Sequence, residues 1–208
     1  FICPVEKIKK GDSVMQIYDI SREFLSAPIF DGDPAPNLSL IQSMDRGDGY
    51  NLSSLSACLH TATHIDAPLH FVDNGASIDE IDLSLFMGEC DVIACNGFDD
   101  DIVGEDIERL IRPGAKRVLF KTVGRCRLTL SGAFALISAG VKLVGIDDVS
   151  IATDEQTAAV HRELALAGVC ILEGLTLSHV QSGRYSLFAL PIKIEGTEAA
   201  PCRAILMK

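Results

Sequence analysis

Basic residues and long apolar runs are both scarce in this chain. Its 208 residues include 18 Lys and Arg against 29 Asp and Glu, a formal net charge of −11. A nucleic acid or an anionic membrane surface needs a basic face on its partner. The sequence contains no run of about 18 apolar residues, which a membrane-spanning helix would need. The composition therefore argues against those partners and leaves a small-molecule substrate as the expectation.

Paired cysteines are also missing, because the seven cysteines are odd in number and form no CxxC motif. This pattern favours dispersed thiols in a reducing compartment, most of them acting as small buried apolar side chains. The first residues lack the apolar segment of a signal peptide. We therefore expect a cytoplasmic protein. The cysteines are Cys3, Cys58, Cys90, Cys95, Cys126, Cys170 and Cys202.

The opening FICPVEKIKKGDSV is more basic than the rest and precedes Met15, where MQIYDIS begins an apolar alternation. Our hypothesis is that residues 1–14 are an N-terminal extension that is not native and that Met15 is the natural start. Residues 15–208 are then expected to form one domain, since 48% apolar content and this length suit a single globular core.

Short β-rich runs alternate with helical patterns in the middle of the chain, while both ends are mostly β-rich. This order predicts a single α/β domain with a mixed sheet and helices on its face. Residues 31–51 are the longest irregular stretch, of a kind that often forms a lid or a partner contact. The expected strands are 15–20, 52–59, 90–95, 117–122, 142–147, 168–174, 185–194 and 203–207, and the expected helices are 105–111, 131–140 and 153–167, the last opened by a TDEQ capping box.

The stretch HTATHIDAPLHF, residues 60–71, holds three of the five histidines together with an aspartate. Neutral imidazole beside carboxylate is a ligand set for zinc and similar cations. The Cα atoms of His60 and His64 would be about 13 Å apart in a straight strand but about 6 Å apart across one helical turn. If both bind one ion, the chain must bend at residues 61–63.

His64 and Asp66 are two residues apart, so in an extended chain their side chains point the same way and can reach one ion. His70 follows Pro68 and could return to the edge of the ion. There it could accept the proton of a water that a divalent cation acidifies. The alternative for the whole group is a solvated loop with coincidental histidines.

Asp66 has two oxygens and could bridge to a second ion. His161, on the expected third helix, could approach Glu173 if that helix runs back along the next strand. A surface helix histidine is the alternative for His161, whereas Glu173 in ILEGL points to function because an unpaired buried carboxylate is costly. His179 resembles an ordinary turn histidine.

HTATHIDAPLHF resembles the HxGTHxDxPxHF signature of the metal-dependent cyclase superfamily, which includes the bacterial kynurenine formamidases. The similarity extends from Met15 through FDGDPAP, KLVGIDDVS and HRELALAGVCILEGL to the closing strands. It implies a swivelling β/β/α domain, usually a homodimer, with two divalent ions, commonly zinc or manganese. The implied ligands are His60, His64 and Asp66 for the first ion, Asp66 as a bridge, and His161 and Glu173 for the second, with His70 as the catalytic histidine.

The resemblance implies a metal-dependent hydrolase of a small amide, first of all an arylformamidase that converts N-formylkynurenine to kynurenine and formate. The alternatives are an isatin hydrolase-like or other cyclic amide or lactone hydrolase, and a non-catalytic relative that binds a small ligand.

Two departures from the family pattern bear on this. Ala62 replaces the signature glycine and would be strained by ~1 kcal/mol or more at a positive φ. The chain has no tryptophan, although aromatic side chains commonly sandwich aryl substrates in this family.

Overall fold

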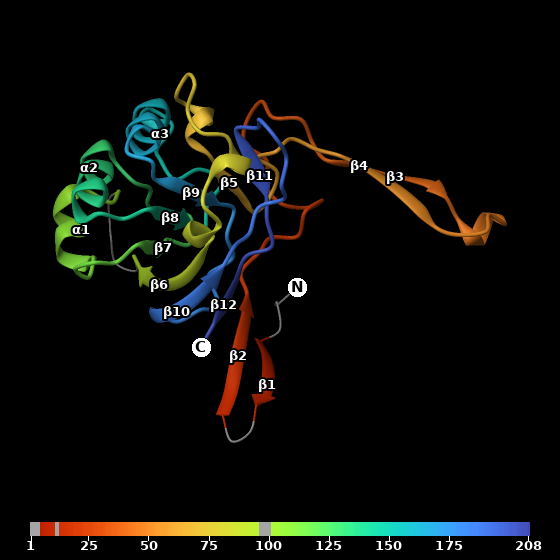
Figure 1. The fold of residues 1–208 in the computed structure, drawn as a ribbon, viewed down its shortest axis with the longest axis horizontal. Helices are drawn as coiled ribbons and strands as arrows, with labels where there is room; N and C mark the ends of the chain where they lie inside the picture. The colour runs from red at the N-terminus through yellow and green to blue at the C-terminus, as the bar shows by residue number, and fades with distance from the viewer. Residues whose placement is uncertain (1–4, 11–12, 96–100) are drawn as a thin grey trace.

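One large mixed sheet, covered by three helices, organises the chain (Figure 1). The computed structural model describes residues 5–10, 13–95 and 101–208. The strand order is β1-β2-β12-β10-β6-β7-β8-β9-β5-β11, parallel from β6 to β9 and antiparallel elsewhere. The predicted α/β domain with a mixed sheet is confirmed. The proposed extension, residues 1–14, is described in part. Residues 1–4, which include Cys3, and residues 11–12 lie outside the described residues. Within the rest, β1 pairs with β2.

The strands of the large sheet have these bounds: β1 Val5–Lys10, β2 Ser13–Asp19, β5 His64–Asp66, β6 Met87–Ala94, β7 Arg117–Lys121, β8 Leu143–Ile146, β9 Cys170–Glu173, β10 Gly183–Phe188, β11 Ala199–Pro201 and β12 Ile205–Met207. The α-helices are α1 Gly104–Leu110, α2 Leu130–Ala139 and α3 Thr157–Leu166. Short 3-10 turns are η1 Met44–Arg46, η2 Pro68–His70, η3 Ile78–Glu80 and η4 Leu83–Phe86. Within the described ranges, no helix combines the length and apolar character required to cross a bilayer.

The helices cover one face of the parallel strands because each parallel pair needs a crossover connection. Along β7, Val118 and Phe120 point to the helix side and join a buried cluster with Leu136 of α2 and Leu164 of α3. Leu119, between them, points to the opposite face. Both faces of β7 are therefore buried at its centre, which explains the consecutive apolar residues 118–120.

The second core lies on the opposite face of the sheet. There Leu119 belongs to a buried cluster with Phe86 of η4, Leu187 of β10 and Leu206 of β12. These partners come from antiparallel strands and their connections, so the sheet curls and packs its outer strands around the central ones. The parallel strands β6–β9 thus have antiparallel strands on both sides, β10 next to β6 and the edge strands β5 and β11 next to β9.

The start of α3 differs from the prediction. The helix begins at Thr157, so the expected TDEQ capping box at 153–156 does not cap it. Gln156 instead accepts a hydrogen bond from Leu130 N at 2.7 Å, at the start of α2. Asp154 lies 2.9 Å from Arg127 as an ion pair. The polar residues before α3 thus connect neighbouring segments rather than closing their own helix.

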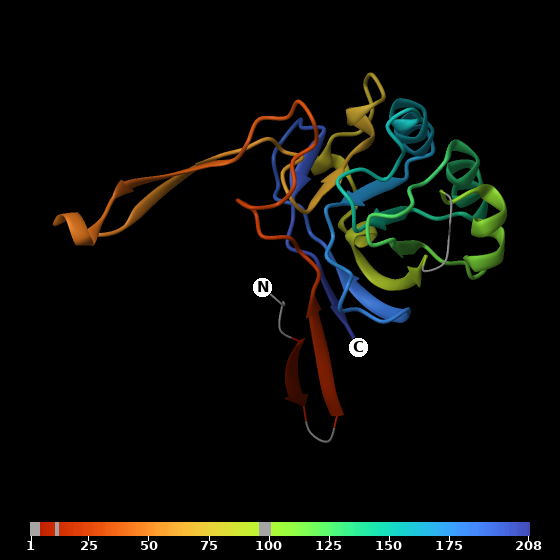
Figure 2. The ribbon, with the colours of Figure 1, turned by 180° about the vertical axis from the view of Figure 1, so that it is seen from behind.

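A two-stranded arm leaves the body of the molecule (Figures 1 and 2). It consists of β3, Asn37–Gln42, and β4, Leu52–Ser56, paired antiparallel as a separate sheet. The prediction of irregular chain for 31–51 was therefore wrong for β3. The strand expected at 52–59 ends at Ser56, and the one expected at 185–194 ends at Phe188.

Candidate metal centre

The segment between His60 and His64 bends through a left-handed residue. Ala62 has a φ of 60°, and its carbonyl accepts a hydrogen bond from His64 Nδ1 at 3.1 Å. Gly174, after β9, packs against this bend so closely that an added Cβ would lie 1.9 Å from the Ala62 oxygen. Thr63 Oγ1 donates to the Gly174 carbonyl at 2.6 Å. The bend predicted at 61–63 is confirmed, with Ala62 in the conformation that favours glycine.

Strand pairing brings imidazole and carboxylate groups together. His64 of β5 lies directly opposite Glu173 of β9, so their side chains share one face of the sheet. His64 Nε2 lies 3.6 Å from Glu173 Oε2 and 3.4 Å from Asp66 Oδ1. All three side chains are buried. The alternative of a solvated loop is therefore wrong for this part of the segment.

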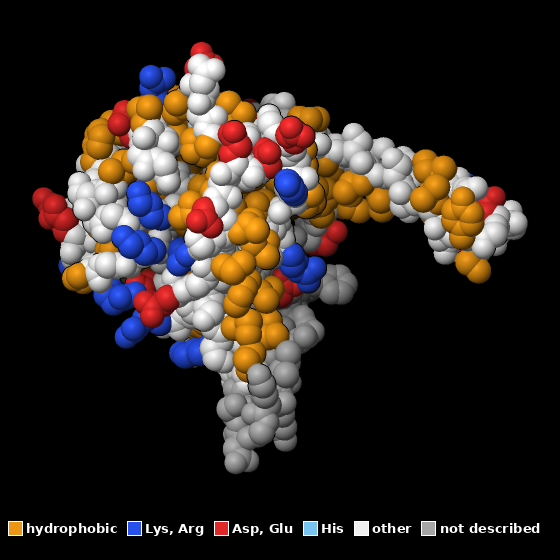
Figure 3. Space-filling model, in the orientation of Figure 1, with side chains coloured by type: hydrophobic (Ala, Val, Ile, Leu, Met, Phe, Trp, Pro, Cys, Tyr) orange, Lys and Arg blue, Asp and Glu red, His pale blue; other side chains and the backbone are white. Residues whose placement is uncertain are grey.

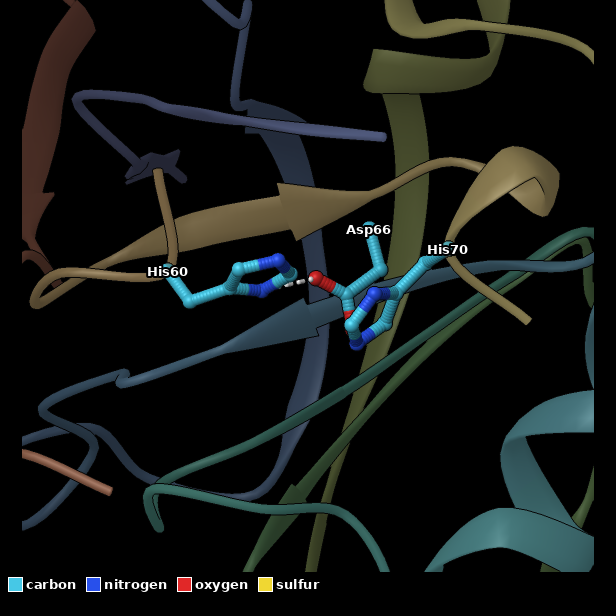
Figure 4. A group of neighbouring side chains, drawn as sticks. All are labelled: His60, Asp66 and His70. Carbon is cyan, nitrogen blue, oxygen red and sulfur yellow. Dashed lines mark ion pairs between the residues drawn. The ribbon is translucent and has the colours of Figure 1, made fainter. Parts of the chain in front are cut away.

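His60 and His70 lie on either side of Asp66 (Figure 4). His60 Nδ1 is 2.9 Å from Asp66 Oδ1, and the ring centroids of His60 and His70 are 4.3 Å apart. His70 ends the turn η2, which Pro68 opens, and this turn returns the chain to Asp66. The sequence prediction that His70 approaches the edge of the site is thus confirmed in position, while its role stays a prediction.

His161 reaches the same cluster from helix α3. Its Nε2 lies 3.2 Å from Glu173 Oε1 and 3.9 Å from Asp66 Oδ2. The side chain is buried, so the alternative of a surface helix histidine is wrong. Glu173 Oε1 also accepts a hydrogen bond from Ile151 N at 2.7 Å, which fixes this carboxylate. The predicted approach of helix and strand is confirmed.

Backbone carbonyls set the orientation of two of these histidines. His161 Nδ1 lies 2.8 Å from the Thr157 carbonyl, and His64 Nδ1 lies 3.1 Å from the Ala62 carbonyl. Because a carbonyl can only accept, each Nδ1 must carry the proton. Each Nε2 then faces the carboxylates, and a cation bound there would take the place of the Nε2 proton, as in histidines that bind metals.

Several buried polar atoms at this point have no hydrogen-bond partner. Of the five such side-chain atoms in the part of the chain that the structure describes, three are His64 Nε2 and the two oxygens of Asp66. The 2.9 Å approach of His60 to Asp66 is short but lacks the direction of a hydrogen bond. Unpaired buried carboxylate oxygens are expensive unless a cation completes them.

The pKa shifts are consistent with negative charge concentrated at the carboxylates of Asp66 and Glu173. Burial opposes a positive charge on His64, but the carboxylates of Asp66 and Glu173 outweigh burial and raise its pKa to about 10. Burial would raise the pKa of Asp66, yet His60 and His64 hold it well below its usual range. For His70, burial dominates and lowers the pKa, so this imidazole is neutral at pH 7.

The donor set fits divalent cations. Ligand-capable atoms of His64, Asp66 and Glu173 lie within 4.8 Å of one another, as do those of His60, Asp66 and His70. Asp66 belongs to both groups, as a bridging carboxylate would. The grouping differs from the predicted division: Glu173 lies beside His64 as well as His161, His70 joins the group of His60, and His161 belongs to neither group.

A pocket of about 200 Å³ opens onto these side chains. Phe30 and Phe71 supply aromatic walls, and Pro28, Ala62 and Val149 complete the apolar lining. The polar floor carries His60, His64, His70, His161 and Glu173. The pocket therefore combines an apolar wall with a cation-binding floor, an arrangement typical of small-molecule sites.

Other residues singled out in the sequence lie apart from the cluster. The ring of His179 sits 6.4 Å from that of Tyr18, in the turn that the sequence indicated. Cys58 follows β4 rather than lying inside it, and its Sγ is 3.8 Å from Asp33 Oδ2. Glu198, by contrast, does reach the cluster, with its Oε1 3.5 Å from His60 Nε2. It was missed because it is one of 29 acidic residues and no local pattern distinguishes it from the others.

Comparison with known proteins places this site in a family. The family model described as "Putative cyclase" matches residues 18–153, and the chain belongs to this family. It is 35% identical over 202 residues to the kynurenine formamidase of Delftia acidovorans, covering 92% of this chain and 97% of that protein.

Solved structures agree with this placement. The predicted metal-dependent hydrolase from Bacillus stearothermophilus has a TM-score of 0.81 at 33% identity, covering 94% of this chain and 99% of that one. An isatin hydrolase bound to the product analogue thioisatinate has a TM-score of 0.82 at 18% identity, covering 93% and 92%. This last similarity shows the shared fold alone.

Proposed function

We propose that this protein is a metal-dependent hydrolase that cleaves the carbon–nitrogen bond of a small amide. The observation that carries the proposal is the convergence of imidazole and carboxylate groups on Asp66, whose buried oxygens are unpaired. The similarity to a kynurenine formamidase over nearly the whole of both chains supports the same reaction class.

The metal ligands in this proposal are His60, His64, Asp66, His161 and Glu173. They would hold two divalent ions, zinc or manganese, with Asp66 shared between them. Ions bound there would polarise the substrate carbonyl and acidify the attacking water. The backbone carbonyls at His64 and His161 keep the Nε2 atoms directed to the carboxylates.

His70 is the proposed proton carrier. Its ring lies against His60 and lines the pocket, and burial keeps it neutral at pH 7. It would accept a proton from the attacking water and deliver it to the leaving nitrogen. Water and a formamide then become an amine, formate and one released proton: one proton of the water reaches the leaving nitrogen through His70, and the other leaves when formic acid ionises.

N-formylkynurenine is the proposed substrate. Phe30 and Phe71 line the pocket and give an aryl group an apolar surface in a chain that has no tryptophan. A cyclic amide such as isatin presents the same features, an aryl ring beside an amide carbonyl, and is the second substrate to compare.

Metal analysis of freshly purified protein, with assays of formate release from N-formylkynurenine and of isatin ring opening, tests the proposal. We expect close to two ions per chain and formate release that a chelator abolishes and added zinc or manganese restores. Bound metal with isatin opening alone would move the substrate to cyclic amides. Protein that neither contains metal nor takes it up would refute the proposal.

We also propose that the protein is a homodimer whose contact includes the β3–β4 arm. Leu38 and Leu55 lie opposite each other on the arm, and each is 53% exposed. Apolar side chains form patches along the arm and at its base (Figure 3). A two-stranded hairpin without further packing is marginally stable in water, and a second copy can cover both arms symmetrically.

A further inference from the structure

His60 differs from the other two proposed histidine ligands in how its ring is held. His64 and His161 each donate from Nδ1 to a backbone carbonyl. On His60 it is Nδ1 that faces Asp66, at 2.9 Å from Oδ1. The outer nitrogen of His60, Nε2, faces the carboxylate of Glu198 at 3.5 Å. The ring nitrogen that faces away from the site therefore meets the Glu198 side chain in His60, whereas in His64 and His161 it meets a backbone carbonyl.

The backbone holds Glu198 beside the site. Its carbonyl accepts a hydrogen bond from Ala67 N at 2.8 Å, one residue beyond Asp66. Thr197 accepts from Ile78 N at 2.9 Å, and β11 begins at the next residue after Glu198. The side chain is 40% exposed, against 15% for His60. The Cα position of Glu198 is therefore fixed, while its exposed side chain can turn. A shift of a few tenths of an ångström would shorten the 3.5 Å between Glu198 Oε1 and His60 Nε2 to a normal hydrogen-bond distance.

We propose that Glu198 is a positioning residue that accepts a hydrogen bond from His60 Nε2 and thereby directs the Nδ1 lone pair toward Asp66 and the cation. This inference rests on the proposed function. A carboxylate in this place fixes the tautomer of the ring and makes the imidazole a stronger electron donor. Loss of such a partner usually weakens metal affinity by about 10–100-fold.

Zinc affinity of the full chain, measured by competition with a chromophoric chelator, tests this role. We expect Glu198→Ala to bind zinc about 10–100-fold more weakly than the natural protein. Glu198→Gln keeps an oxygen acceptor without the charge and should fall between them. Glu195→Ala is the matched control, because Glu195 lies three residues earlier, is exposed and carries the same charge; it should stay within about twofold of the natural affinity, since a lone exposed charge contributes little.

A second readout separates orientation from a general loss of charge. In the zinc-loaded protein with 15N-labelled histidine, the His60 resonances should show a protonated Nε2 and a metal-bound Nδ1. Glu198→Ala should shift the Nε2 resonance, and Glu195→Ala should leave it unchanged. Equal zinc affinities and unchanged His60 resonances in the two variants would overturn the role of Glu198 while leaving the hydrolase intact. Failure of the natural protein to bind zinc or another divalent ion would refute both.

Discussion

The two ends of β9 lie in different environments. Ile171 and Leu172 contribute to the two apolar cores, where close packing surrounds them on each face. Glu173, the next residue, is equally buried but faces His64 and His161. The apolar part of the sheet can be stable by itself, whereas the polar part is held in place by its neighbours and gains from a cation. Substitutions in the first part should therefore affect folding, and those in the second should affect chemistry.

The largest expected effect on chemistry comes from His70→Ala. Removing a positioned acid–base group reduces turnover by about 10²–10⁴-fold. Steady-state kinetics with N-formylkynurenine, together with metal analysis of the same sample, checks this. Turnover should fall while metal content and the melting temperature stay close to those of the natural protein.

The control for this substitution is His179→Ala, which alters a turn histidine outside the metal centre and should leave kcat unchanged. Loss of metal in His70→Ala would contradict the proton-carrier role and make His70 a ligand, as its closeness to His60 and Asp66 allows. Full turnover with metal retained would show that another group carries the proton.

Substitutions in the helix-covered core should lower the stability of the protein rather than its turnover. Leu136→Ala, in the fully buried part of α2, should lower the free energy of unfolding by about 2–5 kcal/mol because it leaves a cavity. Urea denaturation with saturating metal measures it. Leu166→Ala in α3 is the matched control, since Leu166 is 56% exposed and its loss should change stability by less than about 0.5 kcal/mol. Equal losses in the two variants would contradict the division between core and surface.

Sequence patterns predicted the apolar part of the fold better than the rest. Strands such as β7 have consecutive apolar residues at their centre, and Gly140 in the left-handed conformation ends α2 as expected. β3 was missed, whereas β4 lies within the strand expected at 52–59. Among the described residues β3 pairs with β4 alone, so no buried face imposes an alternation on it. β5 and β11, with three residues each, are too short to carry a periodic signal.

For the metal centre, spacing predicted the bend and the shared face of His64 and Asp66. It could not place Glu173 between His64 and His161, because that depends on the register of β5 against β9. The approach of Glu198 depends likewise on the pairing of β11 with β5, two segments far apart in the chain. Local sequence thus predicts the residues of one segment, and strand pairing decides which distant residues join them.

The arm provides a comparison between the body of the molecule and a segment that lacks its own core. Leu38→Ser with Leu55→Ser should weaken the proposed dimer by about tenfold or more, since two exposed leucines would otherwise bury apolar surface in the contact. Light scattering across a dilution series measures the subunit equilibrium, and Leu166→Ser provides an exposed leucine elsewhere as the control. A monomer at every concentration for the natural protein would contradict the dimer.

The smallest expected effect concerns the bend itself. Ala62→Gly should relieve about 1–2 kcal/mol of left-handed strain and lose about 0.4–1 kcal/mol to the greater freedom of the unfolded chain. The net gain of about 0–1.6 kcal/mol should raise the melting temperature by up to a few degrees, measured by calorimetry without change in metal content. Ala67→Gly is the control, because Ala67 is buried as well but has a φ of −89° and should lose stability. If both variants were destabilised alike, the bend at Ala62 would be unstrained, and the packing of its carbonyl against Gly174 and His64 would have to compensate fully for the left-handed conformation.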